Sequence, residues 1–224
     1  MNNSGKAELI ERLKALHEVS NELSTMGSRD DLCRRAVELG CSRLGFDRLG
    51  IWFLDEADPN YVTGSFGVDE QEGIRDERSE RVRLSEFSAM HQVCSEKARI
   101  CVFEDVSLLD HRAQIVGRGN LAIAGVWDGR RFIGYLAADN LFRQKPFTKQ
   151  QSELLGLYAT TIGHLCSLKR TEEALRSSEQ RYRTIVDHTS DSVWRMNMEE
   201  QLTFVSLSAN EMFGYSPAEL LGES

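Results

Sequence analysis

The stretch NLAIAGVWDGRRFIGYLAAD, residues 120–139, decides the fold. Two apolar runs, 120–127 and 131–139, flank an Asp-Gly-Arg segment at 128–130. An Asp-Gly pair between two apolar runs is a strong signal for a β-hairpin. Both runs are almost continuously apolar rather than alternating, which is typical of strands buried on both faces. We therefore predict a hairpin at the centre of a sheet.

Upstream, the pattern predicts two helices and a first strand pair. Apolar residues recur at helical spacing over about 7–26 and 30–44, and Ser28 followed by Asp31 resembles a capping box between them. The segments Phe46–Leu54 and Tyr61–Gly67 are rich in strand-forming residues. We expect these two strands to pair in an antiparallel hairpin.

The middle of the chain is less regular. The charged segment 69–80 is interpreted as a solvated loop, and Val82 with Leu84 as part of an edge strand. A short helix over 88–98 and a strand over Ile100–Phe103 follow, and then an irregular stretch from Glu104 to Gly119. Together with the hairpins, this order predicts an α+β layered domain with a mostly antiparallel sheet.

A long helix follows the central hairpin. Thr148 and Gln151 have capping-box spacing, and the pattern continues to about Val186, or ~58 Å at ~1.5 Å per residue. Two apolar stripes share its first half, and only one of them continues. We expect one stripe to pack on the sheet and the other to form the seam of a parallel homodimer. The predicted seam comprises Leu154, Tyr158, Leu165, Leu168, Leu175 and Tyr182, with Glu172 and Glu179 interrupting it.

Composition excludes several classes of protein. The 224 residues carry a net charge of −8, which argues against a broad nucleic-acid-binding surface. No apolar run approaches the ~20 residues of a membrane span, and the N-terminus has no apolar signal core. Five Cys without a C-x-x-C pair are typical of reduced thiols. A cytoplasmic protein without a membrane or nucleic-acid partner is expected.

Several of these segments resemble a known family. IWFLDE at 51–56, FIGYLAADN at 132–140 and KPFT at 145–148 resemble the strands and the closing helix of a GAF domain. The similarity covers about residues 10–170. It implies a GAF-type, mostly antiparallel sheet flanked by helices, with a ligand pocket between the sheet and a short helix with its loop.

A second resemblance begins after the long helix. SEQRYRTIVDHTSDSVWRMN at 178–197 and TFVSLSANEMFGYSPAELLGES at 203–224 are similar to the opening of a PAS domain. The segment has about half the usual PAS length, so an incomplete PAS-like α/β segment is expected. The predicted organisation is an N-terminal helix at 1–26, a GAF-like domain at 27–168, a signalling helix at 169–186 and the PAS-like segment at 187–224.

The GAF resemblance also implies candidate ligand-binding residues. They are the larger or polar side chains of the strands, helix and loop around the implied pocket, namely Phe66, Met90, Cys94, His111, Trp127 and Tyr135. No Cys precedes a His, as bilin attachment in related domains requires, and the cyclic-nucleotide signature of the family is missing. His91 and Cys94 lack a second ligand pair, so no metal site is expected, and the identity of any cofactor stays open.

Three functions remain open at this point. The combination of a GAF domain, a signalling helix and a PAS segment resembles the sensory front of bacterial histidine kinases and diguanylate cyclases. It implies a dimeric, non-catalytic input module for an unknown small molecule. The first alternative is a GAF-fold methionine sulfoxide reductase that would use Cys94 and Cys101. The second is a ligand-free dimerisation spacer.

Overall fold

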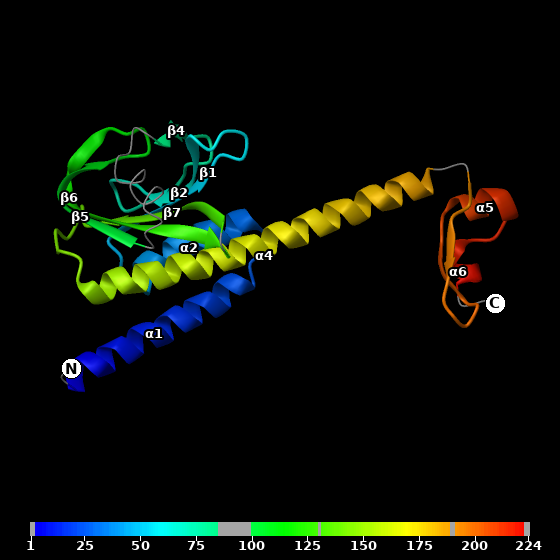
Figure 1. The fold of residues 1–224 in the computed structure, drawn as a ribbon, viewed down its shortest axis with the longest axis horizontal. Helices are drawn as coiled ribbons and strands as arrows, with labels where there is room; N and C mark the ends of the chain where they lie inside the picture. Colours follow the sequence, from blue (N-terminus) through cyan, green and yellow to red (C-terminus); the bar gives the residue numbers. More distant parts are fainter. Residues whose placement is uncertain (1–2, 85–99, 130, 189–190, 222–224) are drawn as a thin grey trace. The chain divides into compact units, whose positions relative to one another are not determined.

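The computed structural model describes residues 3–84, 100–129, 131–188 and 191–221 (Figure 1). The predicted helix at 88–98 lies outside these residues. The chain divides into two compact units, Met1–Lys169 and Arg170–Ser224, which are described separately below. No helix in the described ranges is long and apolar enough to cross a membrane.

The first unit begins with two helices, α1 (Asn3–Ser24) and α2 (Arg29–Ser42). Ser28 precedes α2 with extended backbone angles, and its hydroxyl oxygen accepts a hydrogen bond from Asp31 N at 3.1 Å. The hydroxyl also donates to the Asp31 carboxylate at 2.7 Å. The predicted cap is therefore confirmed.

An antiparallel sheet forms the body of this unit. Within the described residues it has seven strands, in the order β3-β2-β1-β7-β6-β5, and β4 also pairs with β2. The strands are β1 (Arg48–Leu54), β2 (Tyr61–Val68), β3 (Ile74–Asp76), β4 (Arg81–Arg83), β5 (Ile100–Leu109), β6 (Ile115–Asp128) and β7 (Arg131–Asp139). The predicted hairpins β1–β2 and β6–β7 are confirmed, and β6 and β7 lie inside the sheet.

Two loop predictions are wrong. The charged segment 69–80 contains β3, which pairs with β2, and Glu77, which is buried. The segment 104–119 belongs largely to β5 and β6, whose pairing continues past a register shift between Phe103 and Val106. Charged and polar residues are frequent in both segments, so the apolar runs that mark a strand in the sequence are missing there.

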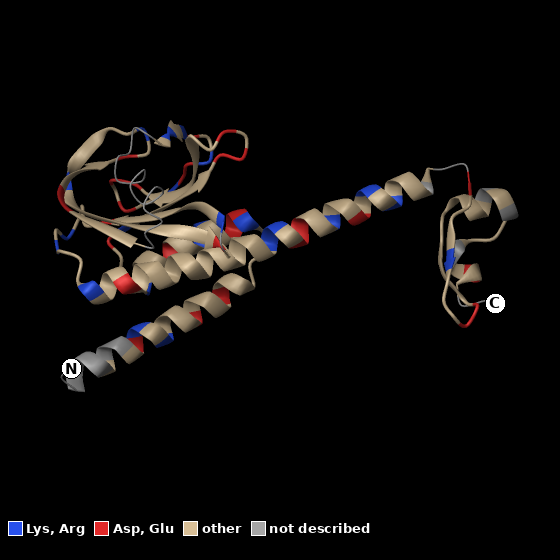
Figure 2. Cartoon of the chain, viewed as in Figure 1, with Lys and Arg blue, Asp and Glu red and all other residues tan. Residues whose placement is uncertain are grey.

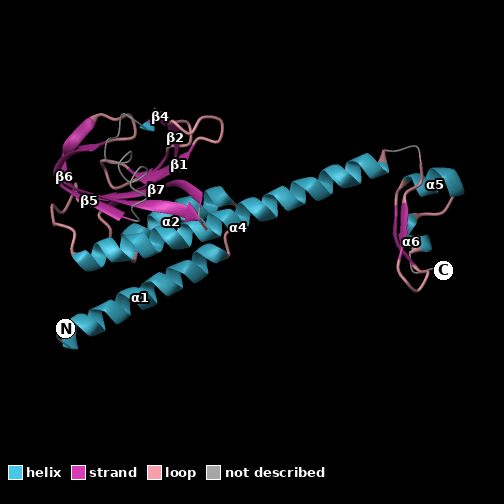
Figure 3. Cartoon of the chain, viewed as in Figure 1, coloured by secondary structure: helices cyan, strands magenta, loops and turns pink. Residues whose placement is uncertain are grey.

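Helices cover one face of the sheet (Figure 3). Leu49, Ile51 and Leu136 point from the strands into a core that they share with α2 and with the first half of α4 (Lys149–Asp187). Tyr158 of α4 is fully buried there and donates a hydrogen bond to Ala36 O of α2 at 2.7 Å. The opposite face of the sheet carries a second, smaller cluster that includes Trp52, Ile123 and Tyr135.

The helix α4 confirms the predicted length and start. Thr148 N and Gln151 Oε1 are 3.1 Å apart, and Gln151 N donates to Thr148 Oγ1 at 3.2 Å, which forms the reciprocal capping box. The seam prediction is wrong for Leu154 and Tyr158, because α2 and the sheet bury both side chains within their own domain. Leu165 is partly buried against the same core.

The second half of α4 is exposed. Leu168, Leu175 and Tyr182 are 46%, 61% and 58% exposed. Basic and acidic residues are interspersed along this part of the helix (Figure 2). The apolar stripe therefore continues, at these three exposed positions, on a charged helix, and Val186 near the end of the helix is buried.

The second unit contains a small hairpin and two short helices. Its elements are β8 (Trp194–Met196), β9 (Leu202–Val205), α5 (Ser208–Phe213) and α6 (Pro217–Leu220). The strands pair antiparallel, and Asn197 Oδ1 accepts hydrogen bonds from the backbone amides of Glu199 and Gln201 in the turn. Ser216 donates to Glu219 from its backbone amide and its hydroxyl, both at 2.8 Å, just before α6 begins.

Candidate ligand-binding site

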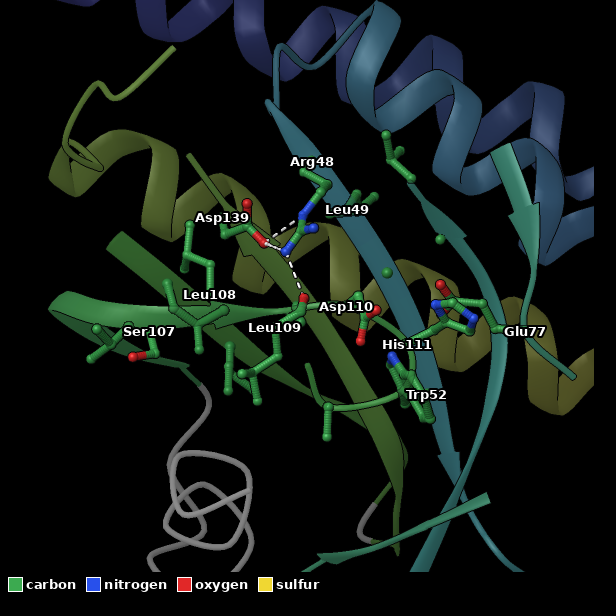
Figure 4. A pocket seen from close by; sticks show the side chains of 18 of the residues that line it. Arg48, Leu49, Trp52, Glu77, Ser107, Leu108, Leu109, Asp110, His111 and Asp139 are labelled. Atoms are coloured by element: carbon green, nitrogen blue, oxygen red, sulfur yellow. Dashed lines mark hydrogen bonds and ion pairs between the residues drawn. The ribbon is translucent and has the colours of Figure 1, made fainter. Parts of the chain in front are cut away.

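A cavity of about 510 Å³ lies on the face of the sheet opposite α2 and α4. Side chains from β1, β2, β5, β6 and β7 line it, together with the β5–β6 turn and residues that follow β2 (Figure 4). Strand alternation explains this placement, since Leu136 and Ile51 face the helices while Ala137 and Trp52 face the cavity. The volume suits a small molecule.

A buried ion pair forms one wall. Arg48 Nε and Nη2 lie 2.8 Å and 2.6 Å from Asp139 Oδ2, and Nη2 also donates to Leu109 O at 2.8 Å (Figure 4). Both residues are less than a tenth exposed. Burial raises the pKa of Asp139, and the guanidinium of Arg48 opposes this rise. The pair ties β1 to β7 and to the end of β5.

A second ion pair lies on the wall formed by β3. Arg75 Nη2 and Nε lie 3.0 Å and 3.1 Å from Glu77 Oε1. Glu77 is 4% exposed, and burial raises its pKa, while Arg75 and the nearby His111 oppose the rise. A carboxylate held in this setting interacts strongly with any charge that enters the cavity.

The β5–β6 turn brings Asp110 and His111 to the cavity. Asp110 Oδ1 accepts hydrogen bonds from the backbone amides of Arg112 and Gln114, both at 2.8 Å, which fixes the turn. The His111 ring lies beside Glu77 (Figure 4), and its Nδ1 atom is buried without a hydrogen-bond partner among the described residues. One end of the cavity is therefore charged.

Most of the other lining residues are apolar. The larger ones are Trp52, Phe103, Val106, Leu108, Leu109, Ile115, Leu121 and Ile123, and Leu49 and Val68 of the helix-facing core also border the cavity. An apolar body with a few polar groups at one end is the usual character of a small-molecule site. The arrangement favours an amphipathic ligand whose charged part meets the ion pairs and His111.

Among the predicted ligand-binding residues that the structure describes, His111 lines the cavity and the others lie in the packed interior or beside it. Tyr135 is fully buried one layer behind it, in the cluster that contains Trp52 and Ile123. Trp127 connects to Tyr135 through the ring of Phe132, with centroid distances of 5.2 Å and 4.9 Å.

Phe66 lies in the core shared with the helices, where the Arg78 guanidinium is 5.2 Å from its ring. Met90 and Cys94 lie outside the described residues. Neither Phe66, Trp127 nor Tyr135 is among the residues that line the cavity.

Sequence analysis missed the ion pairs. Arg75 and Glu77 lie in a run of charged residues that has the composition of a loop. Arg48 and Asp139 lie 91 positions apart, and only the pairing of β1 with β7 brings them together. The alternation along β1 could have indicated Arg48, because successive side chains of a strand point to opposite faces of the sheet. Leu49 and Ile51 face the core, so Arg48, Gly50 and Trp52 must face the other side.

The fold is that of an α+β domain with a cavity on one face of an antiparallel sheet, and comparison with family models identifies the family. A family model for the GAF domain matches residues 28–164, more than half of the chain, so the chain belongs to the GAF domain family. A model for the PAS domain matches residues 180–224. A search of curated protein sequences finds no match.

Solved GAF-fold structures are similar to this chain. The GAF domain from a phosphoenolpyruvate-protein phosphotransferase of Coxiella burnetii has 12% identity and a TM-score of 0.61, covering 74% of this chain and 98% of that one. A fragment of a methyl-accepting chemotaxis protein has 16% identity and a TM-score of 0.57, covering 70% and 99%. The free methionine-R-sulfoxide reductase from Neisseria meningitidis has 13% identity and a TM-score of 0.57, and the match covers 74% of this chain and 93% of that one. At these identities the likeness shows the fold alone.

Proposed function

We propose that this chain is a sensory input module that binds a small molecule in the cavity of its GAF domain. The long helix α4 relays the bound state to the PAS segment and to an output domain such as a histidine kinase or a diguanylate cyclase. The module acts as a parallel homodimer in the cytoplasm. A reducing setting suits Cys33 and Cys166, whose thiols are buried 3.9 Å apart without a disulfide.

One observation carries this proposal. The helix α4 begins in the GAF domain and ends in the second unit, with Leu168, Leu175 and Tyr182 exposed at intervals of seven residues. A stripe with this period is best buried against a second copy of the same helix. The charged positions Glu172 and Glu179 weaken the seam, which suits a helix pair that changes its arrangement in response to a signal.

The packing of α4 supports a route from the cavity to the seam. Gly163 of α4 lies directly against the backbone of Trp127 in β6, where an added Cβ would be 3.0 Å from Trp127 N. The same strand lines the cavity through Leu121 and Ile123. A ligand that binds one position of β6 more tightly than another would therefore bias the position of α4.

Analytical ultracentrifugation of the full chain tests the dimer. The double variant Leu168→Asp, Leu175→Asp is expected to shift the monomer–dimer equilibrium towards monomer. The double variant Ser177→Asp, Thr184→Asp adds the same charge on exposed positions away from the stripe and should leave the equilibrium unchanged. If both double variants behave like the wild type, the seam is wrong.

Native mass spectrometry with an absorption spectrum of freshly purified protein tests ligand binding. A retained small molecule, or a compound that raises the melting temperature by mass action, supports a sensor. If no compound stabilises the GAF domain, the ligand-free dimerisation spacer becomes the better reading.

A second candidate function follows from the fold likeness to the methionine-R-sulfoxide reductase. It would require Cys94 and Cys101 as the attacking and resolving thiols. Cys101 lies partly buried on β5, against the smaller apolar cluster. NADPH-coupled reduction of free methionine sulfoxide, lost in Cys94→Ser, would support the reductase, and absence of turnover in the purified protein would exclude it.

A further inference from the structure

Three side chains with metal-ligating atoms gather where the β5–β6 turn meets the turn after β2. Glu70, Asp110 and His111 each place one donor atom within 4.8 Å of the other two. We infer that these residues bind a divalent transition-metal ion at the edge of the GAF cavity. The inference rests on the proposed function and deepens it, since it names a class of ligand for the same cavity.

Both turns hold their ligands in place. Asp110 Oδ1 is occupied by the backbone amides of Arg112 and Gln114, which leaves Oδ2 as its coordinating atom. Asp69 Oδ1 accepts hydrogen bonds from the amides of Gln71 and Gly73, both at 2.8 Å, and so fixes the turn that carries Glu70. The three donor atoms already lie within 4.8 Å of one another, so the two ordered turns would need to move only slightly closer together to surround an ion.

His111 supplies an independent observation. Its Nδ1 atom is buried and makes no hydrogen bond within the described part of the chain. A buried polar nitrogen without a partner costs about 1–3 kcal/mol, so native structures rarely keep one unless a bound group satisfies it. A coordinated metal ion would fix the ring and use its unmet bonding capacity.

The local charge favours a dication. Glu70, Glu77 and Asp110 contribute three carboxylates around this end of the cavity, and Arg75 lies between two of them, 3.2 Å from Glu70 and 3.0 Å from Glu77. The two ligand carboxylates of Glu70 and Asp110 carry two negative charges, and Arg75 offsets part of this charge through its contact with Glu70. A divalent ion would balance the two ligand carboxylates and leave the contact of Arg75 with Glu77 in place.

The donor set indicates the class of metal. One imidazole with two carboxylates suits Zn²⁺, Fe²⁺ or Mn²⁺, whereas Mg²⁺ and Ca²⁺ prefer oxygen ligands alone. Three protein ligands leave at least one coordination position for water or for a second molecule. Asp110 and His111 line the cavity, so an ion bound to them would present that position to a guest in the cavity.

Calorimetric titration of the tag-free, chelator-treated full chain with Zn²⁺ alone tests the inference. We expect one ion per chain. His111→Ala and Glu70→Gln should each weaken binding by about tenfold or more, since loss of even an outer-shell partner commonly costs that much. His164→Ala, which removes an exposed imidazole from α4, is the matched control and should bind like the wild type.

Co²⁺ absorption bands provide a second readout, because tetrahedral nitrogen and oxygen ligation gives visible bands that depend on His111. Circular dichroism checks that each variant is folded, and Glu70→Gln changes an exposed side chain, so it keeps the test valid if His111→Ala unfolds. No binding of Zn²⁺, or equal binding in His111→Ala and the wild type, overturns the site.

The titration separates this inference from the sensory proposal. A chain that dimerises through α4 but binds no Zn²⁺ refutes the metal site alone. A chain that binds Zn²⁺ through His111 but stays monomeric supports the metal site and refutes the proposed relay.

Discussion

Individual charged residues determine the character of the cavity. Arg48 and Asp139 form their ion pair while both are almost completely buried, whereas Arg118 and Asp105 form a similar pair with side chains that are 62% and 80% exposed. Water screens the exposed pair, whereas the buried partners depend on each other, and on hydrogen bonds with Leu109 O and Leu141 N, to compensate the loss of hydration. The two pairs should therefore differ greatly in their effect on stability.

The first prediction compares these pairs. Asp139→Ala leaves the Arg48 charge buried and uncompensated, which should lower the free energy of unfolding by about 3–5 kcal/mol. Asp105→Ala should lower it far less, because water screens the exposed pair. Urea denaturation of the GAF-domain transition measures both, and equal losses would contradict the assignment of the buried pair.

The second prediction concerns pH and Glu77. Burial raises its folded-state pKa above the ordinary value of 4.5, so the folded protein holds this proton more tightly than the unfolded chain. The resulting stabilisation is complete below about pH 4.5 and is lost as the pH rises through the folded-state pKa. Relative to Glu77→Gln, the wild type should lose stability as the pH rises above about 4.5.

Denaturation of both proteins at several pH values in this range checks the sign. A wild type that gains stability over Glu77→Gln as the pH rises would mean that Arg75 outweighs burial and lowers the pKa of Glu77.

Sequence reasoning reached some residues of the site. His111 was predicted because it lies in the irregular stretch 104–119, which the GAF resemblance places beside the implied pocket. Arg75 and Glu77 were missed because charged residues in a run resemble a solvated loop whether or not the fold buries them. Burial of a charge depends on its partner, and the partner is set by tertiary structure.

Among the helices and strands, the sequence predicted the features that depend on neighbouring residues, namely a hairpin and helix caps. The hairpin of β6 with β7 and the caps at Ser28 and Thr148 depend on residues close in sequence, and the structure contains all of them. The extent of β5 and β6 depends on pairing between strands. It continues across an irregular register that no local pattern reveals.

The contact of α4 with β6 gives the third prediction. A Cβ at Gly163 would collide with the Trp127 carbonyl oxygen, whereas a Cβ at Gly156 of the same helix would meet no atom within 4 Å. Gly156→Ala should therefore stabilise the protein by up to about 1 kcal/mol, as expected for alanine in a helix. Gly163→Ala should destabilise it by about 1–3 kcal/mol through overpacking.

Thermal and urea denaturation of the two alanine variants measure the difference. Equal effects at Gly156 and Gly163 would mean that α4 does not pack directly on the β6 backbone, and the proposed route from the cavity to α4 would lose its physical basis.

At the scale of the whole molecule, a single helix belongs to both units of the chain. Its length and its second apolar stripe were predicted from sequence. Periodicity alone did not show that the domain buries this stripe at Leu154 and Tyr158. The same stripe is exposed at Leu168, Leu175 and Tyr182. The tertiary structure therefore shortens the predicted seam to the part that follows the GAF domain.

Cysteine cross-linking at Leu175 tests the central claim, a parallel helix pair, most directly. In a parallel, in-register dimer the two copies of residue 175 face each other, so Leu175→Cys should form an intermolecular disulfide rapidly under mild oxidation. Ser177→Cys, two residues further on and away from the stripe, should cross-link no more than the wild type with its native cysteines. Equal cross-linking at 175 and 177, or none at 175 in the folded protein, would contradict the account.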